Sequence, residues 1–285
     1  MSNTSGTTRS PLWRRVPERI GAAISAWAAE LASAVSYLGG VLRLLLDVMA
    51  RVRRGLVSRD ARISREALVQ QAVRVGVKSI PIVMLVQLFI GIILALNMAP
   101  TLASYGQIER VADVVAIAIV RELGPLLTAI VLSGFAGASI AAELGTMVEG
   151  EEIKALRAHA PDPIRFLIVP RVIATTVMMI GLVVLADVVG LIGGFITGVF
   201  ILDVSPQTYI DNTQAILTNR DYLTGLFKAG VFGVIIAGLA SYEGLNVRGG
   251  AEGVGRATTA TVVKTIVALI GADCLATAIF YKLGW

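Results

Sequence analysis

The stretch that decides the fold runs from Arg121 to Leu156 and reads RELGPLLTAIVLSGFAGASIAAELGTMVEGEEIKAL. It opens with the charged pair Arg121–Glu122, continues through apolar and small residues, and becomes acidic from Glu143 onward. The apolar part is long enough to cross a bilayer, which takes about 20 residues. Charges within such a segment usually face protein or water rather than lipid. The stretch therefore predicts a membrane span with a polar contact or cavity inside it and a charged segment at its end.

The composition places the whole chain in the membrane class. Of its 285 residues, 55% are hydrophobic and only 16% are charged, whereas soluble domains carry about 25% charged residues. The apolar runs are too long for the strands of an outer-membrane barrel. We therefore expect an all-α polytopic membrane protein.

The distribution of basic residues favours a membrane surface over nucleic acid. The net charge is +5, and many of the arginines precede residue 80 without interleaved aromatic residues. Lysine and arginine collect on the cytoplasmic side of spans and bind anionic headgroups. One cysteine and one histidine exclude an internal disulfide and a histidine-rich metal site.

Three regions are expected along the chain. Residues 1–19 form a disordered basic tail, residues 20–70 an interfacial helix with a connector, and residues 71–285 the transmembrane domain. Glu30, Arg43 and Asp47 interrupt the apolar run of 20–50, and basic residues flank both of its ends. This pattern favours a helix in the cytoplasmic interface, and an additional span is the alternative.

Five spans follow, with the amino terminus inside and the carboxyl terminus outside. They cover about 75–98, 111–142, 170–202, 222–245 and 258–283, and residues 203–221 form a polar outer loop. Gly190, Gly194 and Gly198 of the third span permit close helix packing, either within one subunit or between subunits.

Several polar residues within the spans need partners. Arg121 and Glu122 point about 100° apart on a helix, so each needs a partner elsewhere, and Pro125 predicts a kink beside them. Lys228 and Asp273 lie at similar depth in the fourth and fifth spans, and we expect a structural ion pair between them. Asp187 has no evident partner.

Two further segments suggest function. Residues of the first span recur at helical spacing and predict ordinary packing or an apolar wall for a lipid tail: Leu94, Met98, Leu102 and Tyr105. Between the second and third spans, the charged segment 143–156 carries spaced apolar residues, which predicts an amphipathic cytoplasmic helix that docks on a partner.

The chain shows no catalytic machinery of its own. The glycine-rich stretch GGAEGVGRATT (249–259) has Arg256 where a phosphate loop needs lysine, and no strand precedes it. There is no nucleophile–base arrangement and no cluster of metal ligands in the sequence. We therefore expect a non-enzymatic membrane subunit without a cofactor or metal.

The motifs RELGP, AAELGTM and EGEEIKAL, with EGVGRATTATVV (252–263), resemble the signature of the MlaE/YrbE permease family. The similarity covers about residues 55–285. It implies the membrane subunit of an MCE-type ABC transporter for phospholipids in the bacterial inner membrane. It also implies a homodimer, two cytoplasmic ATPase subunits that bind ATP and Mg²⁺, and an MCE-domain ring on the periplasmic side.

The resemblance also assigns roles to residues. Arg121 and Glu122 match a charged pair facing the lipid cavity, and Leu94, Leu102 and Tyr105 fall where cavity-lining residues are expected. The coupling helix that docks on the ATPase is assigned to Glu143, Gly145, Met147, Glu151 and Leu156, with Glu152 where the family often has glutamine. Phe135 stands where the family usually has arginine, and Asp187 is unusual for the third span.

The resulting hypothesis is a lipid-transport permease in which ATP binding draws the coupling helices together and collapses an apolar cavity. The alternative is an ABC importer permease for another small or apolar solute. An importer for a small polar solute would also carry a coupling helix, but it predicts more polar residues along the pathway than these spans provide. A secondary transporter predicts inverted repeats or a polar relay, and neither is visible. A scaffold that only assembles its partners would tolerate loss of ATPase coupling.

Overall fold

A computed structural model describes residues 12–57, 65–159 and 162–284, and these are helical with short connections and contain no strand. The chain divides into two units, Met1–Leu46 and Asp47–Trp285. The expected all-α polytopic membrane fold is confirmed.

The first unit holds most of one long helix, α1 (Leu12–Val57), whose last turns belong to the second unit. The helix begins at Leu12, so residues 12–19 are helical where the sequence predicted a disordered tail; residues 1–11 lie outside the described residues. Trp27, Val35, Leu38 and Leu42 are exposed and recur at helical spacing, which suits an apolar face in contact with lipid. The segment Trp27–Arg54 also meets the length and composition of a span.

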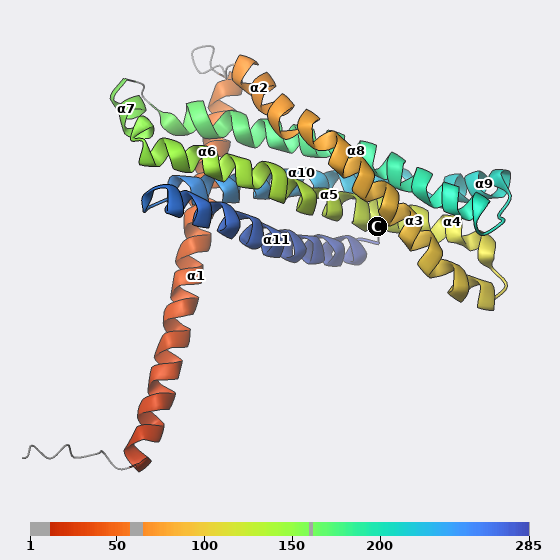
Figure 1. The fold of residues 1–285 in the computed structure, drawn as a ribbon, viewed down its shortest axis with the longest axis horizontal. Helices are drawn as coiled ribbons and strands as arrows, with labels where there is room; N and C mark the ends of the chain where they lie inside the picture. Colours follow the sequence, from red (N-terminus) through yellow and green to blue (C-terminus); the bar gives the residue numbers. More distant parts are fainter. Residues whose placement is uncertain (1–11, 58–64, 160–161, 285) are drawn as a thin grey trace, which may run out of the picture. The chain divides into compact units, whose positions relative to one another are not determined.

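The second unit is a helical bundle (Figure 1). Its α-helices are α2 (Arg65–Val75), α3 (Ile80–Ser104), α4 (Val111–Ala118), α5 (Gly124–Leu132), α6 (Ala138–Glu149), α7 (Glu152–His159), α8 (Val169–Phe200), α9 (Pro206–Ile216), α10 (Asn219–Leu245) and α11 (Gly250–Lys282). Five stretches of this unit are long and apolar enough to span: Arg65–Ser104, Ile108–Glu149, Ile164–Phe200, Asn219–Leu245 and Gly250–Lys282. The five spans expected from the sequence fall on these stretches, and only 170–202 and 258–283 extend past a helical end, by two residues and by one.

Helix α8 packs against both α3 and α10, and glycines permit its close approach to α3, α4 and α9. A methyl group added to Gly91 of α3 would collide with the carbonyl of Gly190, and one added to Gly198 would collide with the Tyr209 ring. A methyl on Gly194 would lie 2.6 Å from Val115 Cγ1. The glycine pattern of the third span therefore serves packing within one chain.

The second span is a helix interrupted by two π-helical segments, η4 (Ile119–Leu123) and η5 (Ser133–Gly137). The first ends just before Pro125, which has no N–H to donate to the preceding turn. Beside Pro125, the side-chain Nε2 of Gln87 in α3 donates to the carbonyl oxygens of Leu123 and Gly124, both at 3.2 Å. The expected irregularity at Pro125 thus places Arg121 and Glu122 within a widened helical turn.

Two segments differ from the sequence expectation. The stretch 203–221 is not simply a loop, because it contains α9, whose first turn begins at Pro206, a favourable first helical residue. The stretch 143–156 is not one helix: α6 ends at Glu149, a turn follows at Gly150 and Glu151, and α7 begins at Glu152. Glu151 has φ 58°, a left-handed conformation that stops a helix.

Candidate functional site

A network of charged side chains lies inside the bundle, where η4, α10 and α11 meet. Arg121 pairs with Asp221 near the start of α10. Lys228 Nζ of α10 lies 2.6 Å from Glu122 Oε2 and 2.9 Å from Asp273 Oδ1 of α11. The structure therefore gives Arg121 and Glu122 partners on another helix, and it brings Lys228 and Asp273 together.

Lys228 is the buried centre of this network. Its side chain is 2% exposed, and its ammonium group also donates to Thr277 Oγ1 at 2.8 Å. The Thr277 hydroxyl in turn donates to Glu122 Oε1 at 3.0 Å. An ammonium has three donors. Glu122 and Thr277 accept hydrogen bonds from Lys228, and Asp273 adds an ion-pair contact.

The network contains two cations and three carboxylates, so it carries one net negative charge when all five groups are ionised. Arg121 is already neutralised by Asp221, and its side chain remains 37% exposed. A bound polar group would therefore meet charges of both signs rather than a free cation.

A small cavity of about 100 Å³ opens beside the network. Its lining comes from η4, α10 and α11: Arg121, Glu122, Thr224, Lys228, Thr277, Phe280 and Tyr281. Typical ligand pockets measure about 300–1,000 Å³, so in one chain this cavity has room for part of a polar group and not for a whole lipid.

The four residues of the first span that were expected to line a lipid cavity do not line the cavity beside Arg121. Leu94 and Leu102 are partly buried against the apolar cluster of Ala95, Ala99 and Val111. Met98 is partly buried, and Tyr105 is exposed at the end of α3. Among the residues lining the cavity beside Arg121 and Glu122, none comes from α3.

Asp221 is a functional candidate that the sequence reasoning missed. Its carboxylate accepts hydrogen bonds at 2.7 Å from both the backbone N–H and the hydroxyl of Thr218, and it also pairs with Arg121. The sequence signal was present, because Thr218 and Asp221 have the spacing of a capping box that starts a helix. Asp221 was missed because residues 203–221 were assigned to a polar loop, whereas α10 already begins at Asn219.

The six residues expected in ATPase coupling fall into two groups. Glu143, Gly145 and Met147 lie in α6, whereas Glu151, Glu152 and Leu156 lie in or after the turn that follows. A methyl on Gly145 would lie 2.8 Å from Val247 Cγ2. Gly145 therefore packs inside the chain.

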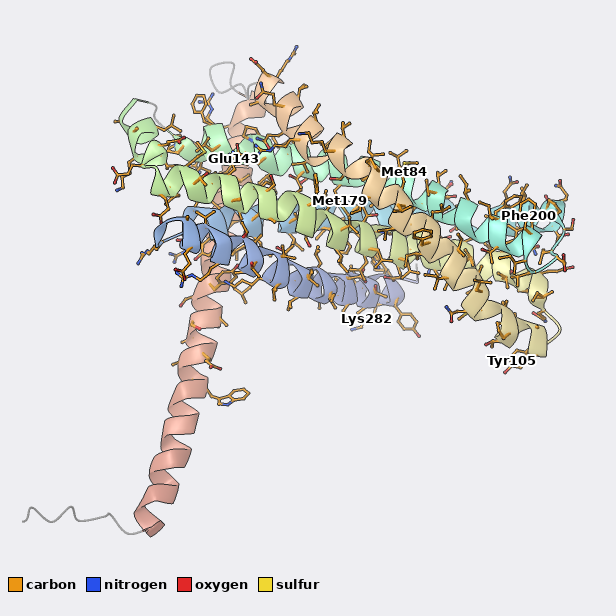
Figure 2. All side chains as sticks on the ribbon, viewed as in Figure 1. Met84, Tyr105, Glu143, Met179, Phe200 and Lys282 are labelled. Carbon is orange, nitrogen blue, oxygen red and sulfur yellow. The ribbon has the colours of Figure 1, made fainter. Side chains whose placement is uncertain are left out.

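Glu143 joins three helices of the bundle. Its two carboxylate oxygens pair with Arg74 Nη1 of α2 at 2.7 Å and with Arg171 Nη2 of α8 at 3.1 Å. Arg171 is 4% exposed and also donates to the carbonyl oxygen of Leu167 at 2.7 Å. Figure 2 shows Glu143 at one end of the bundle and Tyr105 at the other. Glu143 thus holds α6 against α2 and α8, while Glu151 and Glu152 are exposed.

Asp187 of α8 is buried, and its Oδ1 has no hydrogen-bond partner within the described part of the chain. It lies against Gly124, where an added methyl group would overlap Oδ1. The glycine of the RELGP motif therefore makes room for this carboxyl group. The structure gives no further account of Asp187.

Comparison with known proteins identifies the family. A family model described as Permease MlaE matches residues 68–279. A probable ABC transporter permease protein of Rickettsia bellii is 39% identical over 215 residues, covering 75% of this chain and 83% of that protein. The intermembrane phospholipid transport system permease protein MlaE of Haemophilus influenzae is 34% identical over 218 residues, covering 76% and 84%.

A plant relative extends the comparison. The chloroplastic protein TRIGALACTOSYLDIACYLGLYCEROL 1 of Arabidopsis thaliana is 33% identical over 213 residues, covering 75% of this chain and 61% of that protein. The family model's match begins at residue 68, beyond the basic amino-terminal region of this chain, and it includes the residues of the charged network. These matches confirm the resemblance seen in the motifs: the chain belongs to the MlaE permease family.

Proposed function

We propose that this chain is the permease subunit of an ATP-driven transporter that moves phospholipid between the bacterial inner membrane and a periplasmic MCE-domain partner. The observation that carries the proposal is the charged network inside a bundle of apolar spans, in a chain whose relatives include a phospholipid transport permease. An apolar surface suits lipid tails, and a polar cavity suits the group to which they are attached.

The mixed charge of the network defines the kind of headgroup that fits. Arg121 is paired with Asp221 and Lys228 with Glu122 and Asp273. A zwitterionic or hydrogen-bonding headgroup exchanges contacts with both signs, whereas a bare anion would have to displace Asp221 from Arg121. Because one chain encloses only about 100 Å³ here, we propose that two copies of the chain together enclose the lipid.

The proposed contact with the cytoplasmic ATPase is the turn at Gly150–Glu151 together with α7. Glu151 and Glu152 are exposed, and Lys154 Nζ lies 2.6 Å from Glu151 Oε1. Exposed charges at a rim guide association more than they add affinity. Glu143 acts from within the chain by holding α6 against α2 and α8, so motion of the turn is transmitted to three helices.

Co-purification tests the proposed assembly. The tagged chain is extracted from its native membranes, and the proteins and lipids that accompany it are identified by mass spectrometry. We expect an ABC ATPase, an MCE-domain protein and phospholipid, with two copies of this chain in each complex. A chain that purifies without an ATPase and without lipid would contradict the proposal and would favour a secondary transporter.

A further inference from the structure

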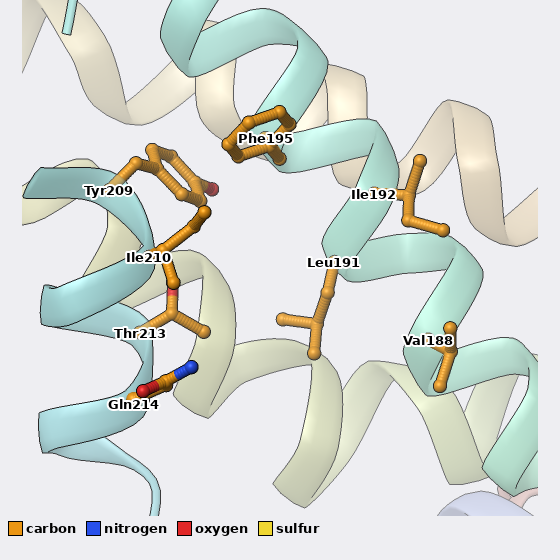
Figure 3. Close-up of a pocket in the computed structure, with 8 residues that line it drawn as sticks. All are labelled: Val188, Leu191, Ile192, Phe195, Tyr209, Ile210, Thr213 and Gln214. Carbon is orange, nitrogen blue, oxygen red and sulfur yellow. The ribbon is translucent and has the colours of Figure 1, made fainter. Parts of the chain in front are cut away.

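A second cavity lies between α8 and α9, away from the charged network. Its volume is about 270 Å³, and α8 contributes Val188, Leu191, Ile192 and Phe195 to its wall. Helix α9 contributes Tyr209, Ile210, Thr213 and Gln214. Figure 3 shows these side chains facing one another across the space between the two helices. No residue is shared with the lining of the cavity beside Arg121.

The wall of this cavity is made almost entirely of carbon, and it opens on an apolar helix face. Val188 is 51% exposed and Ile192 is 47% exposed, although both belong to a candidate span. Exposed apolar side chains on a spanning helix face lipid tails. The cavity is therefore accessible from the hydrocarbon of the bilayer.

The α9 helix gives the cavity a polar border. On its outer side the amide of Gln207 donates to Asp211 at 2.8 Å, and Asn212 donates to the carbonyl oxygen of Glu109 at 3.1 Å. On its inner side the ring of Tyr209 packs edge-on against Phe195, with ring centroids 5.6 Å apart. An amphipathic helix of this kind suits the boundary between headgroups and hydrocarbon.

Two hydroxyl groups at the wall lack partners. The oxygen atoms of Tyr209 and Thr213 are buried without a hydrogen bond in the part of the chain that the structure describes, and Tyr209 is 2% exposed. Both oxygen atoms are buried behind the wall, so the surface that an occupant of the cavity meets is apolar.

From these observations we propose that the cavity between α8 and α9 binds one acyl chain of a membrane lipid. Its size matches this occupant, because an apolar protein cavity of about 150 Å³ already holds a benzene molecule. The proposal concerns binding by this chain alone and does not depend on the proposed transport function.

Photochemical labelling in a bilayer tests the site. The full chain is placed in phosphatidylcholine nanodiscs containing a phosphatidylcholine with a diazirine on one acyl chain, without ATP or other proteins. After irradiation, lipid adducts are mapped by mass spectrometry. We expect more adducts on the peptide containing Ile210 and Thr213 than on the peptide containing Val267, an exposed residue of α11 that reports general contact with lipid.

Matched substitutions on one helix separate binding from general contact. Leu191→Trp fills the cavity and should lower the adducts on the α9 peptide by about tenfold. Val177→Trp places the same side chain at an exposed position of α8 outside the cavity and should leave the labelling unchanged. If Leu191→Trp does not fold, Ile192→Trp fills the cavity from its exposed side.

The proposal is overturned by either of two results. One is labelling of the α9 peptide that does not exceed labelling of the Val267 peptide. The other is labelling that persists in a folded variant whose cavity is filled. Neither result bears on ATP-driven transport, which the co-purified complex tests separately.

Discussion

Lys228 links carboxylates from two other segments of the bundle, Glu122 in η4 and Asp273 in α11. Replacing it with methionine removes the cation and leaves both carboxylates without their partner. Breaking a buried ion pair in this way costs about 3–5 kcal/mol. We therefore expect Lys228→Met to lower the midpoint of thermal unfolding in detergent well below that of the unmodified chain.

The exposed pair Lys154–Glu151 provides the control for this prediction. Exposed ion pairs contribute little to stability because water screens them, so Lys154→Met should unfold close to the unmodified chain. Equal midpoints for both variants would show that the buried network does not stabilise the bundle.

Gly124 offers a second test at the residue scale. A methyl group there overlaps Asp187 Oδ1, and overpacking of this kind costs about 1–3 kcal/mol. We expect Gly124→Ala to be destabilised and Gly124→Ala with Asp187→Ala to regain part of the loss. In Gly181→Ala, by contrast, the new methyl meets no atom within 4 Å, so this variant should be no less stable than the unmodified chain. Lack of rescue by Asp187→Ala in a double-mutant cycle would refute the contact.

The sequence predicts which polar residues need partners, but of the pairs that they form it predicts only Lys228 with Asp273. Helical spacing showed that Arg121 and Glu122 could not satisfy each other, and similar depth in two spans suggested Lys228 with Asp273. The pairing of Arg121 with Asp221 depends on where α10 begins, and Glu122 reaches Lys228 because the turn before Pro125 is widened. Neither of these features follows from hydropathy.

At the scale of elements, the end of α6 and the start of α7 have separate tasks. Glu143 pairs with arginines from α2 and α8, whereas Glu152 begins α7 and is exposed. We expect Glu143→Gln to lower the unfolding midpoint of the permease itself. Glu152→Ala should unfold normally and reduce stimulation of the ATPase in the purified complex. An unstable Glu152→Ala, or a fully stable Glu143→Gln with impaired ATPase stimulation, would reverse these assignments.

The pairing of Arg51 with Asp162 joins the last turns of α1 to the segment before α8, with Nε 2.6 Å from Oδ2. Burial opposes the charge of Asp162, but the hydrogen bond and charge of Arg51 and the backbone N–H groups of Ile164 and Arg165 outweigh it. The pKa of Asp162 is therefore lowered. A lowered pKa in the folded state stabilises the fold above the unfolded pKa of about 3.9, and this contribution is lost as pH falls through the folded value.

This linkage gives a pH-dependent prediction. Asp162→Asn should cost about 1.5–3 kcal/mol at pH 7, as expected for a hydrogen bond to a charged group. The difference from the unmodified chain should shrink as the pH falls below about 4. Unfolding midpoints at pH 7 and under acid conditions measure it, with Glu151→Gln as an exposed control. A difference that does not change with pH would exclude a role for the charge of Asp162.

At the scale of the whole molecule, the membrane fold follows from the length and polarity of the apolar runs, since each stretch predicted as a span overlaps a candidate spanning helix over nearly all of its length. The prediction of a simple loop at 203–221 was wrong because the stretch contains the short helix α9. Since one face of α9 is polar, the mean hydropathy of the stretch is low and does not indicate a helix. The predicted single coupling helix was wrong because Glu151 adopts a left-handed conformation, which residue type alone does not reveal.

The central claim is that this chain moves phospholipid when its complex hydrolyses ATP. The complex purified through the tagged chain is reconstituted in liposomes with a fluorescent phospholipid, and redistribution of that lipid is followed with ATP and with a non-hydrolysable analogue. We predict redistribution with ATP only, with its rate reduced in a folded Arg121→Lys variant. Lipid movement that is equal with both nucleotides, or absent while ATP is hydrolysed, would contradict the account.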